Sequence, residues 1–246
     1  MRSFLKNHPF SVETHFESSI VLTFAVEKEE LQKLIPECLE LDVYDDKWAF
    51  VALAIVKTEN LRPKSFPEFL GNNFILTGYR IFVRYKTSYG KNLRGLYIIK
   101  SETDKVRMAV LGNIFTHYNY TATDISYAKS DAEIKIRSVK SGLNVNIDLE
   151  KANPKLPENS PFPDWAAARR FAGPLPFTFT FNKIKNEVLI IEGVRENWIP
   201  KPIEIVQQNS DFIKSFNFKS IVLANAFIIS DIPYQWKKGK IDLWKP

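Results

Sequence analysis

The chain has 246 residues, 45% of them hydrophobic, which is enough to bury a sizeable core. Its 34 basic and 28 acidic residues give a net charge of +6, but acidic residues stand among the basic ones throughout, which disfavours a nucleic-acid-binding face. The single cysteine, Cys38, cannot form an internal disulfide, and no run approaches the roughly 18 apolar residues of a membrane helix. The N-terminus lacks the apolar core of a secretory signal, so we expect a cytoplasmic protein without nucleic-acid or membrane partners.

Strand-like segments dominate the beginning of the chain. Residues 19–26 are rich in β-branched and aromatic side chains. Residues 28–35 then carry leucine and isoleucine at helical spacing, and a proline ends this pattern. Residues 39–56 predict two strands joined at Asp45 and Asp46, because aspartate tolerates the left-handed backbone of a tight turn.

The middle of the chain predicts two groups of antiparallel strands. Residues 75–87 and 93–102 favour a hairpin with Gly90 in its turn. Residues 120–150 contain three short runs of alternating apolar and polar residues. In the last run, residues 143–149, the apolar side chains share one side and the asparagines and aspartate the other, which indicates a strand with one buried face.

A proline-rich connection at residues 151–164 follows these strands. It contains four prolines and shows no periodicity. A short helix is predicted at residues 163–172, with Asp164 as its N-terminal cap. The segment after this helix is too apolar to stand alone, so we expect one domain over residues 1–246 rather than two.

The last part of the chain predicts a hairpin at residues 177–198, turned at Asn186, a helical turn at residues 211–216 and a long strand at residues 220–232. Altogether the patterns indicate about ten strands and a few short helices, a mainly β protein. Successive hairpins leave strand edges exposed, and closure into a β-barrel removes those edges.

Searches for familiar catalytic and cofactor motifs find no match. His8, His15 and His117 lie too far apart for a zinc site of known spacing. The sequence has no serine-hydrolase elbow, phosphate-binding loop or dinucleotide fingerprint. We therefore expect neither a metal nor a cofactor.

Four fragments, at residues 34–56, 61–85, 169–205 and 224–236, occur in a specific order. Together they resemble the DUF2071 or YqjF-like branch of the acetoacetate-decarboxylase-like superfamily, and the resemblance covers about residues 18–238. It implies a mainly β fold with few short helices, namely a cone-shaped, mostly antiparallel β-barrel with an internal pocket.

The resemblance also identifies a segment of interest, residues 111–120. Acetoacetate decarboxylases carry a lysine pair in the similar segment, and its first lysine forms a Schiff base with the ketone substrate. Here Asn119 and Tyr120 stand at those two places, and neither can form an iminium. We therefore do not expect decarboxylase activity. Lys100 and Lys105, the nearest lysines before the segment, are interpreted as solvated residues at a strand end.

Two arginines, Arg80 and Arg84, lie on the same side of the strand expected at residues 75–87, because side chains alternate along a strand. One of them is therefore expected inside the sheet, and the resemblance points to Arg80. A buried guanidinium requires a carboxylate partner, which either the protein or a ligand supplies. The sequence leaves both origins open.

The candidate ligand-binding residues each have a structural alternative. The candidates are Arg62, Arg80, Asn113, His117, Asn119 and Tyr120. His117 is also the one candidate for acid–base catalysis, and its alternative is a hydrogen-bonded core residue. The structural alternative for Arg62 is an arginine that only holds its loop. Glu192 and Arg195 are also considered, and their structural alternative is an ion pair with each other at a strand end.

We interpret the chain as a small-molecule-binding barrel for an organic carboxylate or an apolar-tailed acid, without Schiff-base chemistry. The alternative is an enzyme, a lyase or hydrolase that acts on a keto acid through His117 or a tyrosine. A third interpretation is a structural or regulatory protein whose interior is filled by side chains. Edge strands and abundant aromatic residues are compatible with a homo-oligomer.

Overall fold

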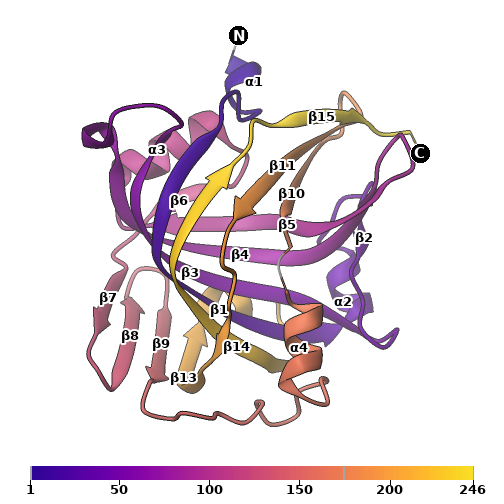
Figure 1. The fold of residues 1–246 in the computed structure, drawn as a ribbon. Coiled ribbons are helices and arrows are strands. Elements are labelled where there is room, and N and C mark those ends of the chain that lie inside the picture. The colour runs from indigo at the N-terminus through magenta and orange to yellow at the C-terminus, as the bar shows by residue number, and fades with distance from the viewer. Residues whose placement is uncertain (1, 174, 246) are drawn as a thin grey trace.

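A closed ring of strands forms the centre of the molecule (Figure 1). The computed structural model describes residues 2–173 and 175–245. Seven strands follow one another around the ring in the order β14-β1-β3-β4-β5-β10-β11, and β11 pairs with β14 to close it. The pairings are antiparallel except those of β5 with β10 and with β6. The predicted mainly β, mostly antiparallel fold is thus confirmed, as a large mixed sheet that closes in a ring.

Four short strands extend this sheet to eleven in all. The eleven strands are β1 (Val12–Glu27), β2 (Glu40–Leu41), β3 (Trp48–Pro63), β4 (Asn72–Lys86), β5 (Asn92–Thr103), β6 (Tyr120–Ala122), β10 (Phe177–Asn182), β11 (Glu187–Arg195), β12 (Lys201–Pro202), β14 (Ile221–Trp236) and β15 (Lys240–Leu243).

Irregular pairing lets the long strands curve around the ring. The strands β1, β3 and β14 have 16 residues each. The register of β1 shifts against β14 between Thr23 and Phe24, and against β3 between Phe16 and Ser18. Such a bulge bends the strand and increases its local twist, and bending is what a flat sheet needs to close on itself.

A second sheet packs on the outer face of the ring. Its strands, in the order β13-β9-β8-β7, are β13 (Glu204–Ser210), β9 (Leu143–Asp148), β8 (Glu133–Ser138) and β7 (Ser126–Lys129). Ile136 and Val145 of this sheet share one hydrophobic core with Leu22 and Tyr79 of the ring. The hydroxyl of Ser210 donates a hydrogen bond of 3.1 Å to the hydroxyl of Tyr79. The three alternating runs predicted in residues 120–150 correspond to β7, β8 and β9.

Short helices and turns connect the strands. The helices are α1 (Arg2–Leu5), α2 (Lys28–Gln32), the 3-10 helix η1 (Glu68–Leu70), α3 (Val106–Phe115), α4 (Trp165–Phe171) and α5 (Asp211–Lys214). The predicted cap of α4 is confirmed, because the Asp164 carboxylate accepts a hydrogen bond of 2.7 Å from the Ala167 amide. The helix α3 was not predicted; its valines, isoleucine and glycine have low helix propensity, and packing of Met108 and Ala109 holds it in place.

The predicted turn residues have the expected backbone. Asp45 and Asp46 have φ angles of 52° and 50°, and Asn186 has a φ of 51°. Gly90 has a φ of 84° between β4 and β5. These positions lie in the left-handed region, which asparagine, aspartate and glycine enter at the least steric cost.

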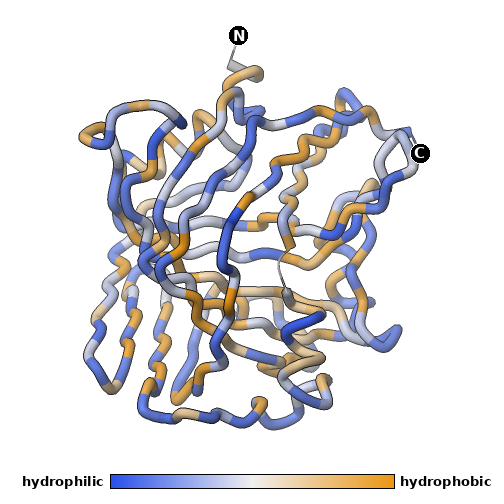
Figure 2. Tube along the Cα trace, in the orientation of Figure 1, coloured by the Kyte–Doolittle hydropathy of each residue, from blue (hydrophilic) through white to orange (hydrophobic). Residues whose placement is uncertain are grey.

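Hydropathy follows this architecture. Figure 2 shows hydrophobic residues recurring along the strands of the ring, whereas the connection at residues 151–164 is mostly hydrophilic. The chain contributes β1, β3, β4 and β5 to the ring before this connection and β10, β11 and β14 after it. Within residues 2–173 and 175–245, no helix is long and apolar enough to span a membrane.

Asp42 joins two arginines at one end of β4. Its carboxylate is fully buried, 2.6 Å from Nε of Arg84 and 2.7 Å from Nε of Arg94. A buried carboxylate that meets two guanidinium groups has its charge compensated and its oxygen atoms hydrogen-bonded. Arg84, one of the two arginines predicted on the same side of this strand, is therefore held by the protein itself.

Replacement of Asp42 should destabilise the fold. In Asp42→Asn, Arg84 and Arg94 lose their shared counter-ion, so the free energy of unfolding should fall by about 3 kcal/mol. Urea denaturation followed by circular dichroism measures this as a lower midpoint. Asp46→Asn is the matched control, because Asp46 pairs with Lys28 on the exposed surface and its loss should leave the midpoint unchanged. Equal midpoints for the two variants would contradict this role of Asp42.

Candidate functional site

The ring encloses a cavity of about 110 Å³, called the inner cavity below. Every one of the seven ring strands contributes lining residues, from Phe16 on β1 to Tyr234 on β14, which places the cavity inside the ring. Small side chains such as Ala52 and Ala54 keep it open, and most of its wall is apolar. This volume has room for several water molecules or for a small organic compound.

Arg80 is the central polar residue of the inner cavity. It lies on β4, where its register partners are Ala52 on β3 and Ile98 on β5. Gly78, two residues earlier on the same face, leaves space for the guanidinium, since an added Cβ there would lie 3.2 Å from Nε of Arg80. Nε itself is buried and has no hydrogen-bond partner among the described residues. Burial lowers the pKa of Arg80, and the nearby Arg195 acts in the same direction, but a guanidinium stays protonated at neutral pH.

Arg195 brings a second guanidinium to the same cavity. It lies at the end of β11, and its guanidinium is 4.1 Å from the ring centroid of Trp198, a cation–π contact. The ion pair with Glu192 considered from the sequence is not formed, because Glu192 pairs with Lys237 at 2.9 Å. Arg195 thus lines the cavity as a half-buried residue, and burial lowers its pKa.

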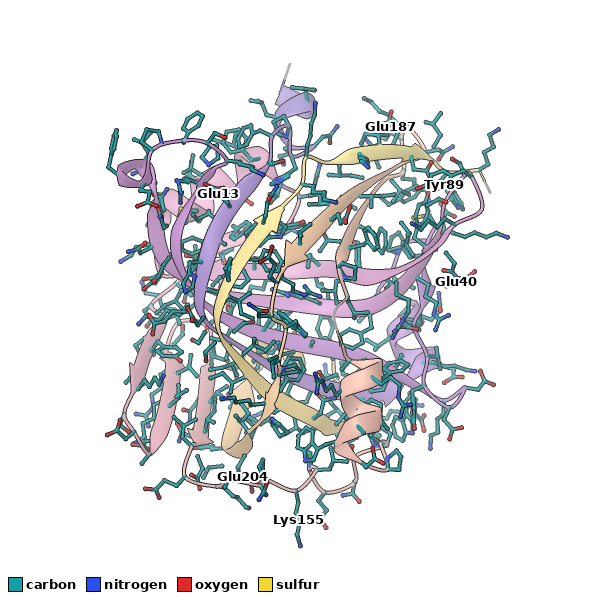
Figure 3. The ribbon with its side chains drawn as sticks, viewed as in Figure 1. Glu13, Glu40, Tyr89, Lys155, Glu187 and Glu204 are labelled. Carbon is teal, nitrogen blue, oxygen red and sulfur yellow. The ribbon has the colours of Figure 1, made fainter. Side chains whose placement is uncertain are left out.

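No carboxylate balances these two cations from within the cavity. None of its lining residues in the described part of the chain is an aspartate or glutamate. In Figure 3, the labelled Glu40, Glu187 and Glu204 lie around the edge of the molecule. Two guanidinium groups without an anion among the described lining residues give the cavity a positive electrostatic potential.

Three tyrosines complete the polar wall: Tyr118, Tyr120 and Tyr234. The hydroxyls of Tyr118 and Thr178 share a hydrogen bond of 2.6 Å. Burial raises the pKa of Tyr118 above its ordinary value and that of Tyr120 to about 12. Both phenols are therefore protonated at neutral pH and can donate hydrogen bonds to an oxygen atom in the cavity.

The segment at residues 111–120 positions two of these tyrosines, Tyr118 and Tyr120. Its first half is the end of α3, and Asn119 turns the chain with a φ of 53°. Asn113 holds the return of the chain, because its side chain accepts from the Tyr120 amide at 2.9 Å and donates to the Tyr120 carbonyl at 2.8 Å. Gly112 lies under the Tyr120 ring, where an added Cβ would come within 2.4 Å of Cδ2. The polar residues of the segment thus serve to place two rings in the cavity.

A larger cavity, of about 470 Å³, adjoins the inner one and is called the outer cavity below. Four residues line both cavities: Leu76, Tyr118, Tyr120 and Trp236. Arg62 lies in its wall, where its Nη2 pairs with Glu13 at 2.9 Å and its Nε donates to the Phe66 carbonyl at 2.9 Å. His8 also lies in this wall, buried, and neither of its ring nitrogens has a hydrogen-bond partner among the described residues.

The predicted candidates are therefore distributed over several places. Arg80 and Tyr120 meet in the inner cavity, and Arg62 lines the outer cavity. The side chains of Asn113 and Asn119 donate hydrogen bonds to backbone carbonyls. Asn113 donates to Tyr120, and Asn119 donates to Ile99 at 3.2 Å. His117 lines a separate surface groove, and burial lowers its pKa.

The lysines near this segment are engaged elsewhere. Lys100 lies 2.6 Å from the buried carboxylate of Glu102 and 4.8 Å from the ring centroid of Phe212, so it is partly buried and paired rather than solvated as expected. Lys105 pairs with Asp104 at 3.3 Å. No lysine is found among the described residues that line the inner or the outer cavity. Nor do these parts of the chain bring together three or more histidine, cysteine or acidic side chains that could hold a metal ion.

Comparison of the sequence with known families matches residues 13–238 to DUF2071, described as an uncharacterized conserved protein. This span covers most of the chain. The chain belongs to the DUF2071 family. The family predicted from the four sequence fragments is confirmed. No curated protein matches this DUF2071 chain significantly in sequence.

Solved structures with the same fold are acetoacetate-decarboxylase-like proteins. The acetoacetate decarboxylase from Legionella pneumophila aligns with a TM-score of 0.61 at 12% identity, over 95% of this chain and 88% of that chain. An acetoacetate decarboxylase-like enzyme from Sphingomonas wittichii aligns with a TM-score of 0.57 at 10% identity, over 94% of this chain and 92% of that chain. The enduracididine biosynthesis enzyme MppR, solved with pyruvate, aligns with a TM-score of 0.55 at 8% identity, over 95% of this chain and 90% of that chain. Identities this low establish that this DUF2071 protein shares the fold.

Sequence reasoning missed part of the wall of the inner cavity in this DUF2071 protein. Arg195, Trp198, Tyr234 and Trp236 all line it. Tyr234 and Trp236 are two residues apart on β14 and therefore share a face, a signal that the alternation of strand side chains provides. For Arg195 the sequence suggests an ion pair with Glu192, and only the pairing of Glu192 with Lys237 of another segment shows that this ion pair does not form.

The burial of His8 should make stability depend on pH. Desolvation lowers the pKa of His8 from 6.5 to about 4. Between these two values the unfolded chain binds a proton that the folded chain does not, so stability is lost as the pH falls from 6.5 to 4. The loss attributable to His8 should reach about 3 kcal/mol. In His8→Asn, in which asparagine tolerates the φ of 52°, urea unfolding should lose this part of the pH dependence.

His15→Asn is the matched control for that experiment. His15 is partly exposed and lies 3.1 Å from the surface residue Asp231, so its replacement should retain the steep fall in stability below pH 6.5. A pH profile of His8→Asn that coincides with that of the unsubstituted protein would contradict the burial of an uncharged His8.

Proposed function

We propose that this protein binds a small organic carboxylate in the inner cavity, with Arg80 as its counter-ion. One observation carries the proposal: Arg80 and Arg195 line this cavity, and among the described residues no aspartate or glutamate does. Burying an unpaired charge is costly, whereas a carboxylate can accept two parallel hydrogen bonds from a guanidinium. The ligand would then supply the anion that the protein does not.

The neutral donors of the cavity favour a ligand with a further oxygen atom. The protonated hydroxyl of Tyr120 lines the same cavity as Arg80 and can donate to a carbonyl oxygen. A 2-keto acid presents a carboxylate and a carbonyl side by side. Pyruvate, the ligand in the solved complex of MppR, is therefore a suitable first probe.

We also propose that the ligand is held without a covalent bond to lysine. A Schiff base requires an amine close to the ligand carbonyl, preferably one with a lowered pKa. The support is the absence of lysine from the described lining of both cavities, together with the ion pairs of Lys100 and Lys105.

The second candidate function is acid–base catalysis on a keto acid. It is favoured by the protonated phenols of Tyr118 and Tyr120 beside Arg80, which suit stabilisation of an enolate oxygen, while solvent water accepts the proton that leaves the methyl carbon. Proton NMR of pyruvate in deuterated water distinguishes this candidate from binding alone. Exchange of the methyl protons that depends on the protein and is lost in Tyr120→Phe would favour catalysis.

Replacement of Arg80 should weaken binding and raise stability together. Arg80→Met keeps an unbranched side chain but removes the charge, so the dissociation constant for pyruvate, measured by isothermal titration calorimetry, should rise at least about tenfold. Because a buried unpaired charge is also removed, the melting temperature of the ligand-free protein should increase. This combination separates a ligand-binding arginine from a structural one, because loss of a structural arginine would lower the melting temperature as well as the affinity.

Arg137→Met is the matched control, because Arg137 lies exposed on β8 in the second sheet. It should bind pyruvate as the unsubstituted protein does. Unchanged affinity in Arg80→Met for pyruvate and for butanoate would contradict the proposal, as would a lower melting temperature.

A further inference from the structure

The inner and outer cavities have a common wall. Leu76 lies on β4, Tyr118 and Tyr120 on the segment after α3, and Trp236 on β14, and all four face both spaces. Arg80 lines only the inner space and the residues of α3 only the outer one. A ligand held at Arg80 therefore lies one layer of side chains away from a second, larger space.

The outer cavity has an apolar lining. Its wall includes Phe10, Leu61, Phe74, Met108, Leu111 and Phe115. Phe66 and Leu70 line it as well, and their side chains are 52% and 43% exposed, so the cavity opens to solvent beside the turn at η1. Its volume of about 470 Å³ lies in the range of sites that enclose small-molecule ligands.

The polar groups of this wall do not favour a second charged group on a ligand. The guanidinium of Arg62 is bound to Glu13 and to backbone carbonyls. Arg107 also lines the cavity, but its side chain is exposed to solvent. His8 is 6% exposed and uncharged at neutral pH.

Two buried polar groups are nevertheless without partners in this wall. Neither the ring nitrogens of His8 nor the hydroxyl of Thr58, which is 2% exposed, has a hydrogen-bond partner among the described residues. Buried polar atoms in native proteins are normally satisfied. These atoms are themselves inaccessible from the cavity, so the surface that the outer cavity presents to a ligand is mostly apolar.

We propose that the outer cavity holds the apolar tail of a carboxylic acid whose carboxylate is held at Arg80, so that the ligand class is a medium-chain or aryl-substituted acid. This inference rests on the proposed function of the inner cavity. Tyr118 and Tyr120 form part of the common wall with ring centroids 6.4 Å apart, so these rings would move apart to let the tail reach the wall formed by α3. Burial of the tail supplies the affinity, and the guanidinium fixes the orientation.

A homologous series of straight-chain acids tests the inference. Isothermal titration calorimetry with butanoate, hexanoate and octanoate should show that each added methylene tightens binding about two- to fourfold. Octanoate should also displace butanoate competitively, because the two share the site at Arg80. Octan-1-amine, which has the same tail and a positive charge, should not displace butanoate.

Filling the outer cavity should remove the effect of chain length. Leu111→Trp places a larger side chain in its wall, so octanoate should bind with about the affinity of butanoate, while butanoate itself should bind as before. Val110→Trp is the matched control, because Val110 is the preceding residue of α3 and is 54% exposed. It should keep the full dependence on chain length.

The outcomes separate the two proposals. If butanoate binds and depends on Arg80, but octanoate binds no more tightly or does not compete with it, the tail site is contradicted and the carboxylate site stands. If no acid binds the unsubstituted protein, the proposed function fails first. Should Leu111→Trp not fold, the chain-length series and the competition on the unsubstituted protein still decide the question.

Discussion

A guanidinium enclosed in an apolar ring without a protein anion is the constraint around which this structure is organised. Taking an ion out of water costs several kcal/mol unless another charge and hydrogen bonds compensate it, a magnitude on the order of a domain's whole stability. Elsewhere the chain meets this cost directly, since Arg84 and Arg94 share the carboxylate of Asp42. Arg80 lies four residues before Arg84 on the same strand face and has three tyrosines near it instead of a carboxylate partner. The difference between these arginines is the basis for placing a ligand in the ring.

The fold relatives share the architecture of this ring but little of its sequence. Acetoacetate-decarboxylase-like proteins share the architecture at identities of 13% or less, so the fold is similar while most side chains differ. An amine in such an interior can attack a carbonyl, whereas a guanidinium remains a cation that binds oxygen atoms without covalent chemistry. In this DUF2071 protein the segment at residues 111–120 places two phenols, those of Tyr118 and Tyr120, in the wall of the cavity. Our proposal of non-covalent carboxylate binding follows from the guanidinium and phenol groups of this lining and from the absence of lysine among its described residues.

Local patterns in the sequence predict much of the fold. Alternation identifies β7, β8 and β9, and the left-handed residues Asp45, Asp46 and Asn186 mark turns because few other side chains tolerate that backbone. The helix α3 is not predictable in this way, since residues such as Val110 and Gly112 are poor helix formers and tertiary packing decides their conformation.

The site is less predictable than the fold, for a related reason. Arg80 and Arg84 occupy the same side of one strand, and only the contact of Arg84 with Asp42, 42 residues away, distinguishes them. Arg195 joins the cavity because β11 closes the ring against β14, which brings its strand end beside Tyr234. Both facts depend on pairings between distant segments, which no local pattern encodes.

The most direct test of this account is a crystal structure of the protein grown with pyruvate. The account predicts pyruvate inside the ring, with its carboxylate within hydrogen-bonding distance of the Arg80 guanidinium and no bond to any lysine. Continuous density from the ligand to a lysine Nζ would contradict it. So would an Arg80 paired with an aspartate or glutamate of its own chain.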